Sequence, residues 1–217
     1  MLILNTHRRI DLFARSAPYY DSILDLGTFG QYAKFLKRAV EILAPQKDEK
    51  ILDLCSGTGR VASWMATAVG DGGEVVGLDI TESMVRVAKE RYGGLRNLIF
   101  LQRDVTWPLG YENYFDGIFT SFALHELSEK RRLGVLEESY LALKEEGRMV
   151  IADFNPQVSG KGKTVSHIFF KLFERDNLNF FLFDQTEILR KAGFKRVKTS
   201  PILAGILQIT LVHLNPE

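Results

Sequence analysis

Three acidic residues in the first half of the chain stand at or near the ends of apolar runs. Asp53 lies in "KILDLCSGTGRVA", where a short apolar run leads into a glycine-rich turn and then into a helix-like pattern. Asp79 ends the run "EVVGLD", and Asp104 ends "LIFLQRD". Carboxylates at the ends of buried strands can accept hydrogen bonds from ribose hydroxyls or from an adenine amino group. These side chains predict a nucleoside site, although Asp79 and Asp104 could each also be a solvated strand end.

The turn after Asp53 indicates which nucleoside ligand would fit. Gly57 and Gly59 let the backbone turn tightly and bring a ligand close to the amides that open the next helix. Alone, "GTGRVA" with Asp79 also matches the fingerprint of an NAD-binding domain. A carboxylate beside a pyrophosphate would repel it, whereas the same carboxylate attracts a cationic amino-acid group. The pattern therefore favours S-adenosylmethionine over NAD, and a tight turn without any ligand is the structural alternative.

The elements that must position these residues alternate between apolar runs and helix-period stretches. Five continuous apolar runs separated by helices predict a doubly wound α/β fold with a mostly parallel sheet. The predicted strands are Lys50 to Leu54, Glu74 to Asp79, Leu98 to Asp104, Phe115 to Phe122 and Arg148 to Phe154. The predicted helices are Gln31 to Ala44, Arg60 to Val69, Glu82 to Tyr92 and Glu129 to Lys144.

The last third of the chain departs from this alternation. A helix, "QTEILRKAG", precedes two apolar runs, "FKRVKTS" and "AGILQITLVHL", whose connection around Pro201 is too short for a crossover helix. These runs predict an antiparallel hairpin. We expect one domain, residues 1–217, with residues 1–30 as an N-terminal cover and residues 155–184 as an inserted aromatic-rich segment. The phenylalanines of that segment could form a substrate wall, ordinary core or a dimer surface: Phe169, Phe170, Phe173, Phe180, Phe181 and Phe183.

The overall composition limits the classes of protein. Lys and Arg (28) nearly cancel Asp and Glu (27) among 217 residues, so no global basic field draws the chain onto nucleic acid. The chain has a single cysteine, so we expect no internal disulfide. It has no Cys/His cluster at metal-ligand spacing, so we expect no metal site. No apolar stretch is long enough for a membrane span, and the apolar start is too short for a signal peptide. We expect a soluble, cytoplasmic protein.

Taken together, these motifs resemble the class I S-adenosylmethionine-dependent methyltransferases over most of the chain. "ILDLCSGTGRVA", "VVGLDITESMVRVAKE", "LIFLQRDVTWPL", "YFDGIFTSFALHEL" and "LKEEGRMVIADF" look like that family's successive strand motifs. "FARSAPYYDSILDLGTFGQY" and "GLDITESM" are most similar to the ubiquinone/menaquinone-biosynthesis C-methyltransferases. The resemblance implies a Rossmann-like sheet of seven strands in the order 3-2-1-4-5-7-6, mostly parallel with a C-terminal antiparallel hairpin.

The resemblance also implies a set of cofactor-binding residues. The stretch from Asp53 to Gly59 would hold the methionine end, Asp79 the ribose, and Asp104 with the Val105 amide the adenine edge. The other implied contacts are Ile80 and Met84 on the adenine faces, Ser121 and Phe122 below the sulfonium, Tyr20 from the N-terminal cover, and Cys55, Ser56 and Gly57 within the turn. Cys55 stands where the family most often has glycine, and "FALHEL" differs from the run usual in the quinone enzymes.

Two residues are candidates for proton transfer. His125 follows the fourth predicted strand and would face the mouth of the site, where an unperturbed pKa near ~6.5 suits a general base. Asp153 ends the fifth predicted strand. Structural alternatives are a His125 that packs or caps at the start of a helix and an Asp153 that accepts from loop amides.

The function predicted from these residues is methyl transfer from S-adenosylmethionine to a small, apolar or aromatic, quinone-like acceptor. The partner expected is that small molecule, with no nucleic acid and no membrane span, and a homodimer could form through the aromatic-rich segment. A non-catalytic S-adenosylmethionine-binding protein and an NAD-dependent oxidoreductase are the alternatives.

Overall fold

The computed structural model describes residues 16–160, 164 and 184–215. Half of the predicted N-terminal cover and the phenylalanines of the predicted aromatic-rich segment lie outside the described residues. The seven strands are ordered β3-β2-β1-β4-β5-β7-β6, as the sequence predicted. The chain divides into two compact units, Met1–Val105 and Thr106–Glu217, and each is described by itself.

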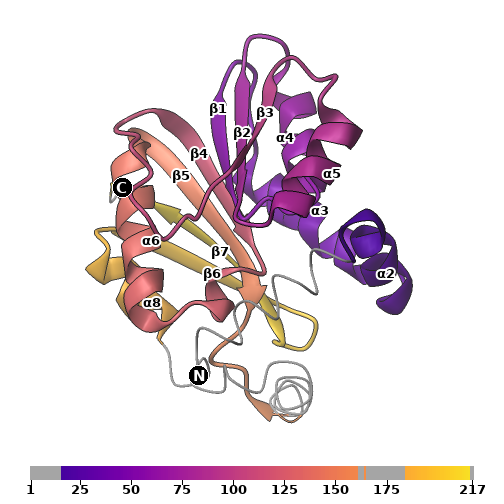
Figure 1. Cartoon of the computed structure of the whole chain (residues 1–217). Helices are drawn as coiled ribbons and strands as arrows, with labels where there is room; N and C mark the ends of the chain where they lie inside the picture. The colour runs from indigo at the N-terminus through magenta and orange to yellow at the C-terminus, as the bar shows by residue number, and fades with distance from the viewer. Residues whose placement is uncertain (1–15, 161–163, 165–183, 216–217) are drawn as a thin grey trace. The chain divides into compact units, whose positions relative to one another are not determined.

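The first unit is a three-stranded parallel sheet with its helices (Figure 1). Helices α4 and α5 pack on the strands, and α3 packs on α4. The elements are η1 (Ala17–Tyr19), α2 (Tyr20–Gly27), α3 (Gln31–Leu43), β1 (Lys50–Leu54), α4 (Arg60–Val69), β2 (Glu74–Asp79), α5 (Glu82–Tyr92) and β3 (Leu98–Gln102).

Local sequence accounts for these elements. β1 and β2 are buried along almost their whole length because helices pack on the sheet, which is why their residues are continuously apolar. In α3 the buried side chains recur at helical spacing, and the helix ends at Ala44, which has a positive φ and precedes Pro45. They are Phe35, Leu36, Ala39 and Leu43.

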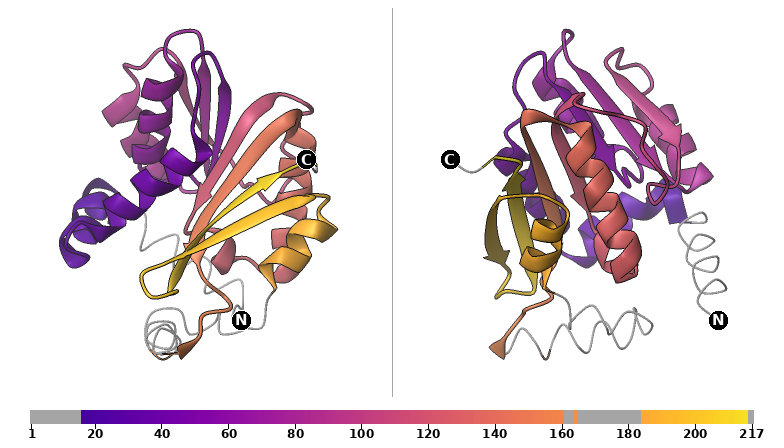
Figure 2. Two further views of the ribbon diagram at one scale, coloured as in Figure 1. Left: turned by 180° about the vertical axis from the view of Figure 1, so that it is seen from behind. Right: turned by 90° about the vertical axis from the view of Figure 1, so that its left-hand side faces the viewer.

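The second unit joins two parallel strands to an antiparallel hairpin (Figure 2). Asp184 caps α8 by accepting hydrogen bonds from the amides of Thr186 and Glu187 at 2.8 and 3.1 Å. No helix among the described residues is long and apolar enough to cross a membrane. The elements are β4 (Phe115–Ser121), η2 (Leu124–Glu126), α6 (Glu129–Ala142), β5 (Leu143–Phe154), α8 (Gln185–Lys191), β6 (Arg196–Ile202) and β7 (Leu207–His213).

Several predicted boundaries were wrong. β3 ends at Gln102, so Asp104 follows the strand by two residues instead of ending it. β5 begins at Leu143, directly after α6. Its pairing with β4 shifts register between Leu143 and Arg148, so the polar residues between these two positions belong to the strand. Pro201, expected in the hairpin connection, lies inside β6. A proline is tolerated there because β6 is the edge strand of the sheet.

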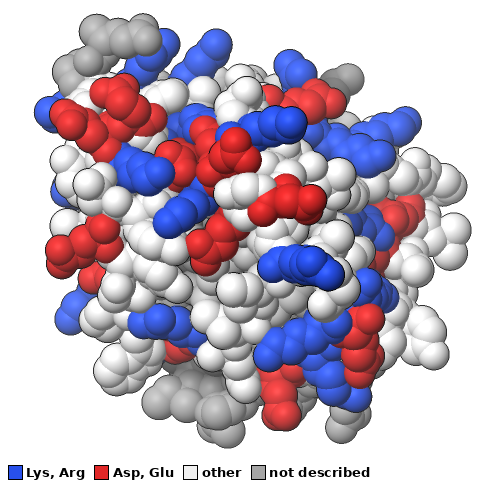
Figure 3. Space-filling model, turned by 90° about the horizontal axis from the view of Figure 1, so that it is seen from above, with Lys and Arg blue, Asp and Glu red and all other residues white. Residues whose placement is uncertain are grey.

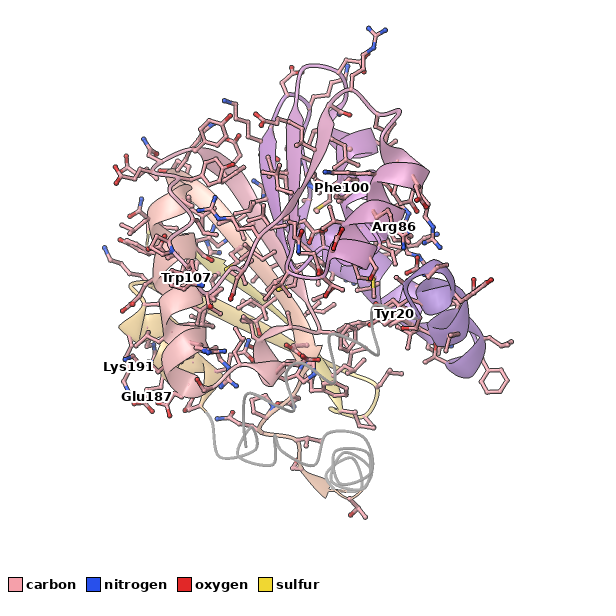
Figure 4. All side chains as sticks on the ribbon, in the orientation of Figure 1. Tyr20, Arg86, Phe100, Trp107, Glu187 and Lys191 are labelled. Atoms are coloured by element: carbon pink, nitrogen blue, oxygen red, sulfur yellow. The ribbon has the colours of Figure 1, made fainter. Side chains whose placement is uncertain are left out.

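Gly59 and Gly30 provide a matched test of packing in the first unit. Both cap a helix with nearly the same left-handed backbone, at φ 80° and 75°. A Cβ on Gly59 would lie 2.5 Å from the Phe100 ring and 2.9 Å from the Ala88 methyl group, whereas one on Gly30 meets nothing within 4 Å. Phe100 is labelled on β3 in Figure 4.

We expect Gly59→Ala to lower the free energy of unfolding by about 1 to 3 kcal/mol more than Gly30→Ala does, because overpacking adds to the shared backbone strain. Urea unfolding monitored by circular dichroism measures both values. Equal losses in the two variants would contradict the proposed contact with Phe100.

Candidate functional site

The glycine turn closes at the carboxyl ends of β1 and β2. Ser56 N donates to Leu78 O at 2.8 Å, and Gly59 N donates to Ser56 O at 3.0 Å. Gly57 and Gly59 both have a positive φ. A Cβ built on Gly57 would meet nothing within 4 Å, so the turn is open at that residue. A ligand can therefore approach the backbone of the turn at Gly57.

Asp79 binds the turn to the end of β2. Its Oδ2 accepts from Gly57 N at 2.8 Å, and its Oδ1 accepts from Thr81 N at 2.8 Å. The residue is only 8% exposed, and burial raises its pKa despite these hydrogen bonds. Each carboxylate oxygen can accept a second hydrogen bond, so Asp79 fixes the turn and retains acceptor capacity for a ligand.

Asp53 is buried within β1. It is the fourth residue of the strand, which has the predicted bounds, and it is 2% exposed. Burial, followed by the charge of Asp79, raises its pKa well above the usual value, and a hydrogen bond from the Ala62 backbone opposes that shift. Its Oδ2 atom has no hydrogen-bond partner among the described residues. The Oδ2 atom therefore lacks a donor or a cation, and the hydrogen bond from Ala62 does not offset the burial of the group.

This burial predicts a pH dependence of stability. A carboxyl group whose pKa is higher in the folded than in the unfolded protein destabilises the fold as pH rises from about 4 through the folded-state pKa. Asp53→Asn removes that contribution. We expect the variant without cofactor to be at least as stable as the wild type at pH 4 and more stable at pH 8, by about 1 kcal/mol or more.

Urea unfolding of both proteins at a series of pH values measures this difference. Asp71→Asn, at an exposed position in the loop before β2, is the control and should show no such pH-dependent gain. A variant that is less stable than the wild type at pH 8 would show that Asp53 is stabilising as a carboxylate.

The residues predicted to hold the adenosine part differ in exposure. Ile80 is 44% exposed, whereas Val105 is buried. Met84 is also buried and packs with Ala17, Val87 and the half-buried Tyr20. Tyr20 stands at the start of α2 (Figure 4). Ile80 is thus available to a ligand, and Met84 joins α5 to the N-terminal elements.

The segment after β3 is bound to the end of β2. Arg103 N donates to Asp79 O at 2.8 Å, and the Gln102 side chain donates to Ile80 O at 3.1 Å. Asp104 follows directly and is partly exposed. These two hydrogen bonds hold the backbone before Asp104 against the end of β2.

Cys55 occupies an unusual backbone conformation. Its φ is 61°, in the left-handed region that favours glycine. The glycine that the resemblance leads one to expect here would adopt this conformation without strain. Ser56 follows with a buried Oγ atom that has no hydrogen-bond partner among the described residues.

The second unit brings both predicted proton-transfer residues together. His125 Nδ1 lies 2.7 Å from Asp153 Oδ1, and His125 N donates to Asp153 Oδ2 at 3.2 Å. His125 is expected at the mouth of a site, and in the structure its side chain is buried, at 4% exposed. Asp153 also accepts from Phe154 N at 2.8 Å, so it holds backbone amides as well as the imidazole.

Aromatic rings surround this pair. The Phe154 ring packs edge to face with Phe122 at 5.5 Å and with His125 at 5.0 Å between centroids. Phe122 follows Ser121, the last residue of β4, and donates its amide to Ala152 O at 3.0 Å. Ser121 and Phe122 therefore lie beside the end of β5, next to the His125 and Asp153 pair.

Sequence reasoning missed the residue that supports this pair. Arg132 is buried in α6 and donates from Nε to Leu124 O and from Nη2 to Leu127 O, each at 2.8 Å. Burial lowers its pKa, and the charge of Asp153 opposes that shift. The available signal was the spacing of Arg132 from the apolar residues Val135 and Leu136 on one helical face.

The strand order and the terminal hairpin define a class of protein. A sheet in the order β3-β2-β1-β4-β5-β7-β6, with an antiparallel β6 and β7 and a glycine turn after β1, is the Rossmann-like fold of class I methyltransferases. The unpartnered oxygen of Asp53 fits a cationic cofactor better than a pyrophosphate.

Comparisons with known proteins identify the family. A family model for the methyltransferase domain matches residues 51–147. The ubiquinone/menaquinone biosynthesis C-methyltransferase UbiE of Pectobacterium carotovorum is 29% identical over 158 residues, which are 71% of this chain and 62% of that protein. UbiE of Yersinia enterocolitica is 31% identical over 148 residues, 67% of this chain and 58% of that protein. The chain thus spans less than two thirds of the length of these curated relatives.

Solved structures share the fold. A SAM-dependent methyltransferase from Aquifex aeolicus has a TM-score of 0.62 at 24% identity, covering 82% of this chain and 88% of that one. DhpI, in its DhpI-SAH complex, has a TM-score of 0.68 at 19% identity and covers 96% of both chains. The chain has the fold of the class I S-adenosylmethionine-dependent methyltransferases and is similar to the UbiE proteins, and S-adenosylmethionine is the cofactor that this family and fold imply.

Proposed function

We propose that the protein transfers a methyl group from S-adenosylmethionine to a small, apolar or aromatic, quinone-like acceptor. The observation that carries the proposal is the buried Asp53, whose Oδ2 atom lacks a partner among the described residues, next to Asp79 and the open side of the turn at Gly57. An anionic, phosphate-repelling site of this kind suits a cofactor with an ammonium and a sulfonium group.

We assign a part in cofactor binding to each predicted cofactor-binding residue of the first unit. Asp53, assisted by the turn residues Cys55, Ser56, Gly57 and Gly59, holds the cationic methionine end. Asp79 accepts from the ribose hydroxyls with the lone pairs that its two backbone hydrogen bonds leave unused. Ile80 and Met84 contact adenine, Asp104 and the Val105 amide bind its edge, and Tyr20 adds a contact from α2. When bound, the cofactor supplies an electrophilic methyl group.

The second unit supplies the groups that act on the acceptor. Methylation of a carbon, oxygen or nitrogen nucleophile releases one proton, and we assign His125 to take it. Asp153 accepts a hydrogen bond from Nδ1–H of His125, which orients the imidazole, and we assign Nε2 to take the proton of the acceptor. Ser121 and Phe122 contribute to the floor of the site.

Two observations support an aromatic acceptor of low molecular weight. The rings of Phe122 and Phe154 pack edge to face beside His125, and such rings favour contact with another aromatic ring. The relatives in the comparison are named for ubiquinone and menaquinone biosynthesis. Acidic and basic side chains alternate over the face of the molecule shown in Figure 3, which does not resemble a basic surface for nucleic acid.

The burial of His125 favours a second candidate, a non-catalytic protein that binds S-adenosylmethionine. In that case His125 and Asp153 are a buried structural pair that joins η2 to β5. The two candidates share the cofactor site and differ only in turnover, so they require separate measurements of binding and of methyl transfer.

The first test of the proposed function is cofactor binding. We expect calorimetric titration to detect S-adenosylhomocysteine binding to the wild type, and we expect Asp53→Asn and Asp79→Asn each to weaken it about tenfold or more, because each removes a charged hydrogen-bonding partner. Asp71→Asn should leave the affinity within about twofold of the wild type. No binding to the wild type, or binding of NADH instead, would overturn the cofactor assignment.

The second test of the proposed function is methyl transfer. With a labelled methyl donor and a 1,4-hydroquinone that has an unsubstituted ring carbon, we expect His125→Asn and Asp153→Asn to lower kcat by about 10²- to 10⁴-fold. Their affinity for S-adenosylhomocysteine should change little. His213→Asn, at the end of β7, is the matched control and should retain the wild-type rate.

The wild-type result also separates the two candidate functions. Binding without turnover on hydroquinone, phenol or amine acceptors would favour the non-catalytic protein. Turnover that persists in His125→Asn would assign His125 a structural part and leave the methyltransferase proposal intact.

A further inference from the structure

A buried carboxylate of the N-terminal helix contacts the glycine turn. Asp21, the second residue of α2, is 5% exposed, and its Oδ2 accepts a hydrogen bond from Thr58 Oγ1 at 2.8 Å. Thr58 lies between Gly57 and Gly59 and is itself buried. The contact joins residues that are 37 positions apart in the sequence.

Two arginines hold Asp21 in this position. Arg91 Nη1 at the end of α5 donates to Asp21 Oδ2 at 2.6 Å, and Arg60 Nε at the start of α4 lies 3.4 Å from Asp21 Oδ1. Arg91 Nη2 also donates to Pro18 O at 2.7 Å. The Asp21 carboxylate is buried and pairs with both Arg91 and Arg60. These ion pairs fix the position of Oδ2, which accepts the hydrogen bond from Thr58.

The same helix has further contacts with the first unit. Asp25 pairs with Arg60 at 2.9 Å, one turn of helix beyond Asp21. Tyr20 hydrogen-bonds with Tyr32 of α3, and burial together with the nearby Tyr20 and Asp21 raises the pKa of Tyr32 well above its usual value. The Tyr32 hydroxyl therefore stays protonated and keeps this hydrogen bond at neutral pH.

The turn is otherwise held by the ends of the strands. Asp79 holds the Gly57 amide, and Leu78 O accepts from the Ser56 amide. Glycine has the least restricted backbone of all residue types, so Thr58, which lies between Gly57 and Gly59, needs an anchor to keep one conformation. Asp21 is an anchor of this kind that comes from outside the sheet.

We propose that Asp21 is a positioning residue, which through Thr58 holds the glycine turn in its cofactor-binding conformation and so makes cofactor affinity depend on the docking of α2. This rests on the proposed cofactor site. A turn that adopts the competent conformation only part of the time has an apparent Kd that is larger by the inverse of that fraction. The N-terminal helix would then tune cofactor binding without touching the reacting atoms.

The test removes the single hydrogen bond with Thr58→Val, which keeps the side-chain shape, and restores it with Thr58→Ser. We expect Thr58→Val to raise the Kd for S-adenosylhomocysteine and the KM for S-adenosylmethionine on the order of tenfold, with kcat within about twofold. Thr58→Ser should stay within about twofold of the wild type. Glu41→Gln is the control, because it removes the exposed Arg38–Glu41 ion pair of α3, which includes neither Asp21 nor a residue of the turn.

Hydrogen exchange of the peptide that spans residues 54–62 gives a readout without any ligand. We expect faster exchange there in Thr58→Val and not in Thr58→Ser. Wild-type affinity and wild-type exchange in Thr58→Val, or an equal loss of affinity in Glu41→Gln, would overturn the proposal. If the wild type itself binds no S-adenosylhomocysteine, the proposed function fails, and the exchange experiment alone decides whether Asp21 positions the turn.

Discussion

The first unit depends on the burial of carboxylates near the carboxyl ends of β1 and β2. Asp53 and Asp79 are enclosed by the strands and by the start of α4, and burial raises the pKa of both. Asp79 is partly compensated by two backbone amides, whereas one oxygen of Asp53 has no partner among the described residues. A sequence selected only for stability would replace Asp53 with an amide or an apolar residue. The retained carboxyl group, which a cationic ligand would stabilise in its ionised form, is the main physical reason to assign such a ligand to this site.

The buried charged groups of the second unit have partners within the protein. Its buried charges are matched within the protein, because Asp153 holds His125 and two backbone amides, and Arg132 holds two carbonyl oxygens of the segment around η2. A fully satisfied polar cluster fixes one arrangement of the chain between β4 and α6. The cofactor assignment therefore rests on the Oδ2 atom of Asp53, which has no partner among the described residues. The assignment of His125 rests only on its geometry with Asp153.

The sequence predicted the elements better than the environments of their side chains. Short, mostly apolar runs located β1 and β2 to the residue, because both strands are buried along almost their whole length. The same reasoning did not show that the side chains of Asp53 and His125 are buried, since a pattern of residue types does not show what packs over a side chain. The contact of Asp21 with Thr58 could not be predicted, because it joins distant segments through charges that look solvated in sequence. The assignments of individual residues to the cofactor and to the acceptor stay predictions.

Pro201 gives the outer strand of the hairpin a second property. β6 lies at one edge of the sheet, where unpaired backbone groups would otherwise offer a template for a strand from another molecule. Proline lacks an amide hydrogen, and the exposed Arg196 and Lys198 add charge along the same strand. This edge is therefore a poor acceptor for further strands, which protects a seven-stranded sheet from edge-to-edge aggregation.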